Sequence, residues 1–284
     1  MNQRKPLVSV IIPTYNRDFI LEMAIKSVLN QTYRPVELIV VDDGSKDKTP
    51  LLVKKYPLKY VRLPKNFGVS FARNRGILHS KGELIAFLDS DDEFLPKKIE
   101  KQVNFFLTHP ECRILQTEEI WYKGEKRLNP KKYHAKAEGF FLDRAVKLCV
   151  VSMSTVMIKR EVFRELGLFD EEFPVCEDYE YWLRVAIHMP VYLLKEPLVV
   201  KHGGRADQLS QRKGLDFYRI KALLKNYKNY YHRLSEEEKL LILAEAKRKT
   251  LIFSQGAQKH GNLKALFELS KMWSNFYPKG LPNF

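Results

Sequence analysis

Three carboxylates lie close together in the sequence and could bind a hard divalent cation. They lie in the segment F-L-D-S-D-D at 87–92, at the end of an apolar run. Asp89 and Asp91 leave the chain two residues apart at a turn, so both can ligate one divalent cation. Oxygen ligands of this kind favour Mg²⁺ or Mn²⁺ that also binds a diphosphate. The alternative is an acidic loop that only caps the following helix.

Polar residues also follow two other apolar runs in the first hundred residues. In open α/β sheets, ligands bind beyond the carboxyl ends of the strands, so these polar turns are expected to converge on one crevice. No glycine-rich dinucleotide fingerprint and no P-loop motif occurs, so phosphates must be bound in another way. The residues that follow the two runs are Thr14, Tyr15, Asn16 and Arg17, and Asp42, Asp43, Gly44 and Ser45.

The elements that must position these turns alternate between strand and helix. Apolar runs predict strands over 8–12, 36–41, 59–62 and 84–88. Helical spacing predicts a helix capped by Asp18 that stops near Gln31, and further helices over 45–56, 69–79 and 96–107. This order predicts right-handed crossovers, and hence an α/β fold with a doubly wound, mainly parallel sheet flanked by helices.

Beyond His109 the alternation becomes irregular. Strands are expected over 113–116, 120–122, 153–158, 191–194 and 198–200, and helices over 161–166 and 178–188. From Leu215 the pattern is helical, with breaks near Leu234 and Gly261. We expect an acceptor-side region joined to the first sheet, followed by a helical C-terminal extension.

Composition bounds the class of protein. The 284 residues, 45% of them hydrophobic, are enough for a proper core, and neither a signal peptide nor a membrane-spanning run is expected. Three widely spaced cysteines predict no disulfide framework and no zinc site, which fits a reducing, cytoplasmic compartment. The net charge of +15 favours anionic partners, although solubility charge on exposed helices explains it equally well.

Four motifs in a fixed order resemble one enzyme family. They are V-S-V-I-I-P-T-Y-N at 8–16, V-V-D-D-G-S at 40–45, N-F-G at 66–68 leading to A-R-N at 72–74, and F-L-D-S-D-D. Together they resemble the family 2 inverting glycosyltransferases with a GT-A fold, over roughly residues 7 to 204. The resemblance implies metal-assisted transfer of a sugar from a nucleoside diphosphate donor, expected to be UDP-linked. The acceptor would be a hydroxyl of a glycan or lipid-linked molecule, as in cell-surface polysaccharide biosynthesis.

The resemblance also assigns roles on the donor side. Asp42 would accept a hydrogen bond from the imide of a pyrimidine base, which is chemically sensible because an imide N–H needs an acceptor. The alternatives are that Asp42 or Ser45 only caps the next helix and that Arg73 only pairs with a neighbouring acid. The implied donor-binding residues are Pro13, Thr14, Tyr15, Asn16, Asp42, Arg73, Asp89, Ser90 and Arg205, and the implied metal ligands are Asp89, Asp91 and His202.

A further segment, C-E-D-Y-E-Y-W at 176–182, resembles the family's acidic pair, in which the Asp is the general base. Inverting transfer needs one carboxylate that removes the proton of the acceptor hydroxyl, and Asp178 is the candidate. The alternative is that Glu177 and Asp178 favour the helix dipole and Trp182 is core. His202 is expected in a glycine-flanked turn, K-H-G-G-R at 201–205, where Arg205 and Arg212 could hold phosphates or simply be solvated.

The expected domains are 1–108, the nucleotide-sugar-binding half; 109–206, the acceptor-side and catalytic-base region of the same domain; and 207–284, the helical extension. Aromatic and basic residues over 215–274 suit peripheral contact with the inner face of a membrane or a homodimer contact, and plain packing onto the body is the alternative. No nucleic-acid partner is expected, because no such signature appears.

Two other functions compete with glycosyl transfer. A non-catalytic nucleotide- or polyanion-binding protein could use the same crevice and the basic extension. Nucleotidyl transfer is disfavoured, because it needs a glycine-rich basic loop where this chain has P-T-Y-N at 13–16.

Overall fold

The computed structural model describes residues 4–129, 134–205, 208 and 214–276, and the predicted phosphate ligand Arg212 lies outside them. Contacts divide the chain into two compact units. The first comprises Met1–Phe141, Val150–Pro174 and Pro190–Ala206, and the second Leu142–Cys149, Val175–Met189 and Asp207–Phe284. We call them the α/β unit and the helical unit.

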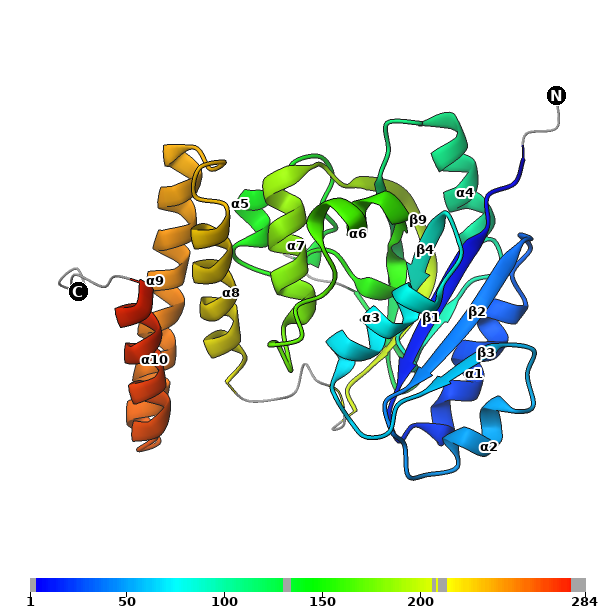
Figure 1. Ribbon diagram of the computed structural model, residues 1–284, viewed down its shortest axis with the longest axis horizontal. Helices are drawn as coiled ribbons and strands as arrows, with labels where there is room; N and C mark the ends of the chain where they lie inside the picture. Colours follow the sequence, from blue (N-terminus) through cyan, green and yellow to red (C-terminus); the bar gives the residue numbers. More distant parts are fainter. Residues whose placement is uncertain (1–3, 130–133, 206–207, 209–213, 277–284) are drawn as a thin grey trace. The chain divides into compact units, whose positions relative to one another are not determined.

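The described part of the α/β unit holds a nine-stranded sheet with the order β3-β2-β1-β4-β8-β6-β9-β5, and β7 pairs with β6 (Figure 1). In its first half, β1 pairs in parallel with β2 and β4, and β2 pairs in parallel with β3. The predicted α/β class and its alternating order are confirmed. The elements are β1 (Val8–Thr14), α1 (Asp18–Leu29), β2 (Val36–Asp42), α2 (Thr49–Val53), β3 (Lys59–Arg62), α3 (Val69–His79) and β4 (Leu84–Phe87).

The second half of the sheet is mixed. Strands β4 and β6 both pair antiparallel with β8, and β5 pairs antiparallel with β9, whereas β6 and β9 run parallel. The elements are β5 (Asp92–Phe94), α4 (Lys98–Thr108), β6 (Ile114–Lys123), β7 (Lys126–Leu128), the 3₁₀ turn η2 (Met153–Thr155), β8 (Met157–Lys159), α6 (Arg160–Leu166) and β9 (Tyr192–Gly203).

Several local predictions were wrong. The pairs of short strands expected over 113–122 and 191–200 are single strands, because register shifts beside Glu118 let β6 stay paired with β9 past Pro197. The strand expected over 153–158 begins as the η2 turn. Strand β5 was not predicted.

Two predicted helix caps were also wrong. The helix expected over 45–56 is only Thr49–Val53, and Ser45 lies in the turn before it. Arg17 occupies the N-cap position of α1 without a side-chain cap, and Asp18 is its first residue. The Asp18 carboxylate instead accepts a hydrogen bond from the Lys48 N–H at 3.3 Å, which ties α1 to the turn before α2.

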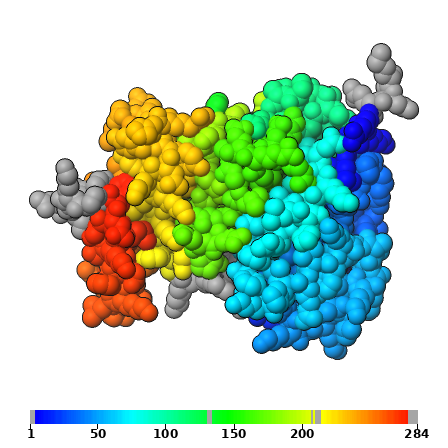
Figure 2. Space-filling view, in the orientation of Figure 1, coloured from blue at the N-terminus to red at the C-terminus, as the bar shows by residue number. Residues whose placement is uncertain are grey.

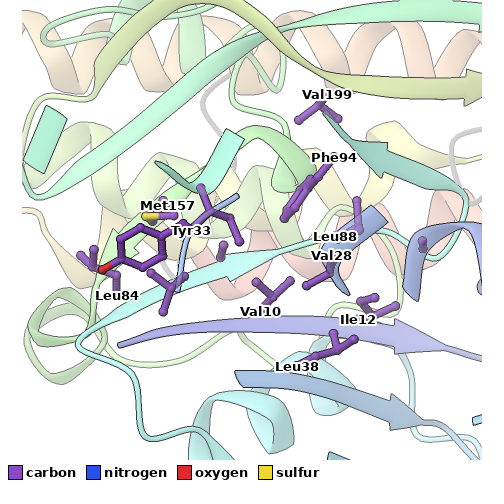
Figure 3. Close-up of a cluster of buried hydrophobic side chains, with 14 of the residues drawn as sticks. Val10, Ile12, Val28, Tyr33, Leu38, Leu84, Leu88, Phe94, Met157 and Val199 are labelled. Atoms are coloured by element: carbon purple, nitrogen blue, oxygen red, sulfur yellow. The ribbon is translucent and has the colours of Figure 1, made fainter. Parts of the chain in front are cut away.

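The core of the α/β unit joins both halves of the sheet. Figure 3 shows Val10 and Ile12 of β1 near Leu38 of β2, with side chains from β4, β5, β8 and β9 in the same cluster. Burial of these apolar side chains is the main force that holds the strand ends in place, at about 25 cal/mol per Å². The labelled members are Val10, Ile12, Val28, Tyr33, Leu38, Leu84, Leu88, Phe94, Met157 and Val199.

The described part of the helical unit is built from α5 (Leu142–Ala145), α7 (Glu177–His188), α8 (Leu215–Asn229), α9 (Glu236–Lys259) and α10 (Leu263–Phe276). Figure 2 shows α10, in red, lying against α9, in orange. The indole Nε1–H of Trp273 donates to Thr250 Oγ1 at 2.9 Å across this contact. Of the helices within the described ranges, none has the length and apolarity needed to cross a bilayer.

Candidate active site

The turn after β1 connects the turns after β2 and β4. The Asn16 N–H donates to Ser45 Oγ at 2.9 Å, and Asn16 Oδ1 accepts from the Lys46 N–H at 2.8 Å. On the other side, Arg17 Nη1 lies 3.2 Å from Asp91 Oδ1 and 3.3 Å from Ser90 Oγ. The polar turns that the sequence placed at three strand ends therefore meet at one edge of the sheet.

The loop after β3 joins the same edge. Asp43 accepts hydrogen bonds from the backbone N–H groups of Phe67 and Gly68 at 2.7 and 2.8 Å. Burial raises the pKa of Asp43, and these two N–H groups oppose that effect. Gly44 has a φ of +78°, and a Cβ there would lie 2.6 Å from the carbonyl carbon of Lys65, so only glycine fits. The sequence did not assign Asp43 a role.

Asp42 is fully buried and already has hydrogen-bond donors. Its Oδ1 accepts from the Ser45 N–H at 2.8 Å, and its Oδ2 accepts from the Tyr60 hydroxyl at 2.5 Å. Burial and the Asp42 carboxylate raise the pKa of Tyr60, so that hydroxyl stays protonated and donates. The Asp42 carboxylate bonds within the turn at Ser45 and does not cap α2, which begins at Thr49. The base-binding role of Asp42 stays a prediction.

The end of β1 and the first residue after it present side chains that a ligand could contact. Thr14 is 4% exposed, and its hydroxyl has no hydrogen-bond partner among the described residues. Pro13 is buried beside it, and the Tyr15 ring is 40% exposed. An unpartnered buried hydroxyl costs free energy, so a ligand that bonds to it would recover that cost.

The turn after β4 is held by cations and by hydroxyl groups. Arg73 of α3, buried against the Phe169 ring, donates from Nη2 to Asp89 Oδ1 at 3.0 Å. Burial alone would raise the pKa of Asp89, but the charges of Arg73 and Lys201 outweigh burial and lower it. Asp89 is thereby kept ionised. The predicted alternative, that Arg73 pairs with a neighbouring acid, describes this contact, and a role toward the nucleotide stays a prediction.

Asp91 lies between two arginines. Its Oδ1 is 3.2 Å from Arg17 and its Oδ2 is 3.4 Å from Arg205, and its side chain is only 8% exposed. The guanidinium of Arg205 also lies 5.5 Å from the centre of the Phe19 ring. Asp91 and Arg205, predicted from distant parts of the sequence, are therefore in contact.

A hydroxyl and an ammonium group hold the next carboxylate of this turn, Asp92. The Ser154 hydroxyl accepts from the Asp89 N–H at 3.1 Å and donates to Asp92 Oδ2 at 2.6 Å. The Lys201 ammonium lies 3.5 Å from Asp92 Oδ2. Burial raises the pKa of Asp92 to about 7.

The glycine-flanked turn predicted for His202 was wrong. His202 lies within β9, opposite Tyr122 of β6, because β9 continues to Gly203. Its Nε2 is 2.8 Å from Glu93 Oε1, a carboxylate to which the sequence gave no role.

The predicted metal ligands are Asp89, Asp91 and His202. The part of the chain that the structure describes contains no group of three or more His, Cys, Asp or Glu side chains placed to hold a metal ion. Asp89 and Asp91 fit Mg²⁺ or Mn²⁺ in donor type and spacing. His202, however, pairs with Glu93, and both oxygens of Asp91 face arginines.

Asp178 belongs to the helical unit, at the second position of α7. Its Oδ1 accepts from the Tyr179 N–H at 2.7 Å, and its Oδ2 accepts from the Cys149 thiol at 3.4 Å. Trp182 is buried, as the structural alternative predicted, while the side chain of Asp178 is partly exposed. The sequence did not reveal the contact with Cys149, which is 29 residues away along the chain.

The model of the family described as "Glycosyl transferase family 2" matches residues 9–167, more than half of the chain. The chain belongs to glycosyl transferase family 2. Its curated relatives include an uncharacterized glycosyltransferase of Rickettsia typhi, 34% identical over 209 residues, which are 70% of this chain and 64% of the relative. Another is TuaG of Bacillus subtilis, named for a proposed part in teichuronic acid biosynthesis. It is 36% identical over 166 residues, covering 57% of this chain and 65% of TuaG. The chain thus spans less than two thirds of the length of these relatives.

Solved structures show that this family 2 chain has the expected fold. Residues 1–349 of S. aureus TarS in complex with UDP-GlcNAc align with a TM-score of 0.76 at 22% identity, over 95% of this chain and 80% of that one. The mannosyltransferase PcManGT from Pyrobaculum calidifontis, in complex with GDP-Man and Mn²⁺, aligns with a TM-score of 0.62 at 18% identity. That match covers 96% of this chain and 84% of PcManGT. At these identities the likeness establishes the fold, and the GT-A-type prediction is confirmed.

Proposed function

We propose that this chain is an inverting glycosyltransferase that moves a sugar from a nucleoside diphosphate donor to a hydroxyl of a glycan or lipid-linked acceptor. The observation that carries the proposal is the turn after β4. There Asp89 and Asp91 contact Arg73, Arg17 and Arg205, which come from three other parts of a family 2 chain. Carboxylates for a cation and guanidinium groups for phosphate oxygens are thus concentrated in one place.

A UDP-linked sugar is the proposed donor. Asp42 has lone pairs beyond those used by Ser45 and Tyr60, so it can accept a further bond from a pyrimidine imide. The unpartnered Thr14 hydroxyl and the half-exposed Tyr15 ring suit a base and ribose at the same edge. A UDP-sugar is also what TarS holds in its complex.

Asp89 and Asp91 are proposed to hold a divalent cation, Mn²⁺ or Mg²⁺, with His202 as a further candidate ligand. When bound, such an ion neutralises the charge that builds on the departing diphosphate. Arg17 and Arg205, which now face Asp91, are the residues of this chain that can bind phosphate oxygens beside it. Their charge adds to the stabilisation of the leaving group.

Asp178 is proposed as the general base. One carboxylate suffices for inversion: it takes the proton of the acceptor hydroxyl as the oxygen attacks the anomeric carbon, while the diphosphate leaves from the opposite face. The partial exposure of Asp178 and its position at the start of α7 support this role. We further propose a cytoplasmic protein acting in cell-surface polysaccharide synthesis. In this proposal the basic helical unit contacts the inner membrane surface or a second copy of the chain.

The test is a panel of nucleotide sugars, each with Mn²⁺, Mg²⁺ or EDTA, scored by thermal shift and by release of the nucleoside diphosphate. We expect a UDP-sugar to raise the melting temperature only when metal is present, and to be turned over. A GDP-sugar that outperforms every UDP-sugar would contradict the donor assignment. Tight binding without turnover, with every glycan and lipid-linked acceptor supplied, would favour the non-catalytic alternative.

A further inference from the structure

The C-terminal helices hold the helix that carries Asp178. Glu180, two residues beyond Asp178, accepts a hydrogen bond from Asn226 Nδ2 of α8 at 3.2 Å. The other oxygen of Glu180 accepts from Arg184 at 2.8 Å. Glu180 and Asn226 are 3% and 1% exposed, so this polar contact is buried. A buried polar contact fixes geometry, because breaking it leaves an unsatisfied group.

A second connection runs from α9 to the partner of Asp178. Lys249 Nζ donates to the main-chain carbonyl of Lys147 at 3.1 Å and lies 3.1 Å from Glu245 Oε1. The Tyr179 hydroxyl donates to the carbonyl of Val146 in the same segment. That segment, 142–149, ends at Cys149, whose thiol donates to Asp178 Oδ2.

Burial of the Lys249 ammonium group would destabilise the fold if the group had no partners. Its side chain is 4% exposed, and burying an ammonium group is unfavourable unless it is paired and hydrogen-bonded. Here it satisfies a carbonyl just beyond the short helix α5, a group that has no partner within the helix. The ammonium therefore fixes the position of the segment that ends at Cys149.

We propose that the C-terminal helices position the catalytic base, with Lys249 acting through the 142–149 segment and Cys149, and Asn226 acting through Glu180. This inference rests on the proposed role of Asp178. A thiol is a weak donor, so Cys149 orients the carboxylate more than it changes the charge balance. Orientation matters because a base must lie within hydrogen-bond reach of the proton it removes.

The kinetic test compares two lysines of α9. Lys249→Met is expected to lower kcat by up to about tenfold, because it removes one hydrogen bond that positions the 142–149 segment. The KM for the donor should stay within about twofold of the wild-type value. Lys259→Met removes the same charge from an exposed position of the same helix and should leave both constants unchanged. Cys149→Ala should lower kcat, and Cys149→Ser, which keeps a donor, should restore most of it. Equal loss in both Cys149 variants, or a raised donor KM in Lys249→Met, would overturn the proposal.

A second measurement is independent of turnover. The Cys149 thiol donates to Asp178 Oδ2, so Asp178→Asn, which removes the charged acceptor, should speed the alkylation of Cys149 by iodoacetamide, as followed by peptide mass spectrometry. Lys249→Met should speed it as well, and Lys259→Met should not. Cys112, which is fully buried, serves as the internal control. An unchanged alkylation rate in Asp178→Asn would overturn the contact itself. An Asp178→Asn variant that still transfers sugar would instead overturn the proposed base.

Discussion

The two units hold the carboxylates proposed for donor binding and for proton removal by different means. In the α/β unit, Asp89 and Asp91 face arginines from the N-cap of α1, from α3 and from the residues that follow β9. In the helical unit, the donors to Asp178 within the described residues are neutral, a backbone N–H and a thiol, and helices hold the surrounding segments. Compensated charge suits a site that binds a charged ligand, whereas a carboxylate with two neutral donors retains lone pairs that can accept a hydrogen bond from a hydroxyl. We therefore expect mutations to separate the proposed donor binding from the proposed proton removal.

The largest effect should come from removing the charge between the two arginines. Asp91→Asn is expected to lower kcat/KM by about 10² or more, because it weakens metal binding and leaves Arg17 and Arg205 without their shared carboxylate. EDTA should inhibit the wild type to a similar degree, and added Mn²⁺ should restore it. Full activity of the wild type in EDTA would contradict the proposal that Asp89 and Asp91 hold a divalent cation.

A smaller effect is expected from the arginine behind Asp89. Arg73→Met removes a charged hydrogen bond and should weaken donor binding about tenfold, as measured by calorimetry with UDP. Arg75→Met, on the same helix, is the matched control, since its guanidinium stacks on the Phe71 ring at 4.4 Å. Equal losses of UDP affinity in both variants would show that binding depends on the overall positive charge of α3 and not on the contact between Arg73 and Asp89.

Thr14 allows a finer test of the sheet edge that is proposed to bind the UDP-sugar. Thr14→Val removes a hydroxyl without a protein partner, so the free energy of unfolding should stay within about 0.5 kcal/mol of the wild type. UDP affinity should nevertheless fall several-fold, and Thr14→Ser should keep it. Unchanged affinity in Thr14→Val would remove this hydroxyl from the ligand contacts.

The smallest effect on activity is expected at Lys98, a buried lysine of the α/β unit outside the site. Its Nζ has no hydrogen-bond partner among the described residues and lies 3.9 Å from the centre of the Phe94 ring. Burial lowers the pKa of Lys98 well below its ordinary value, so the unfolded chain binds the extra proton and wild-type stability should fall as the pH is lowered. Lys98→Met should raise the free energy of unfolding by about 1–3 kcal/mol at neutral pH and make it less dependent on pH, with activity unchanged. Denaturant titrations at several pH values measure this free energy.

The sequence predicted the elements whose periodicity is regular. Helix α3 and strand β3 begin and end at the predicted residues, because their patterns are bounded by clear turns. The joined strands β6 and β9 could not be predicted, since a register shift depends on the partner strand. Asp18 and Ser45 were misassigned as caps because their side chains bond across the fold, to the turn before α2 and to Asn16.

The sequence predicted that polar turns at three strand ends meet, and the contacts of Arg73 with Asp89 and of Arg205 with Asp91 lie at that meeting point. The roles of these residues toward a donor or a cation stay predictions. Tyr60, Glu93 and Cys149 could not be found, because their contacts with Asp42, His202 and Asp178 span 18 to 109 residues and leave no local pattern. Only the fold brings such pairs together.

The most direct measurement is UDP binding and sugar transfer in one variant, Asp178→Asn. Metal-dependent UDP affinity, measured by calorimetry, is expected to stay within about twofold of the wild type while kcat falls by about 10²–10⁴. Parallel loss of UDP affinity and turnover would contradict the separation of donor binding from proton removal, as would transfer at the wild-type rate.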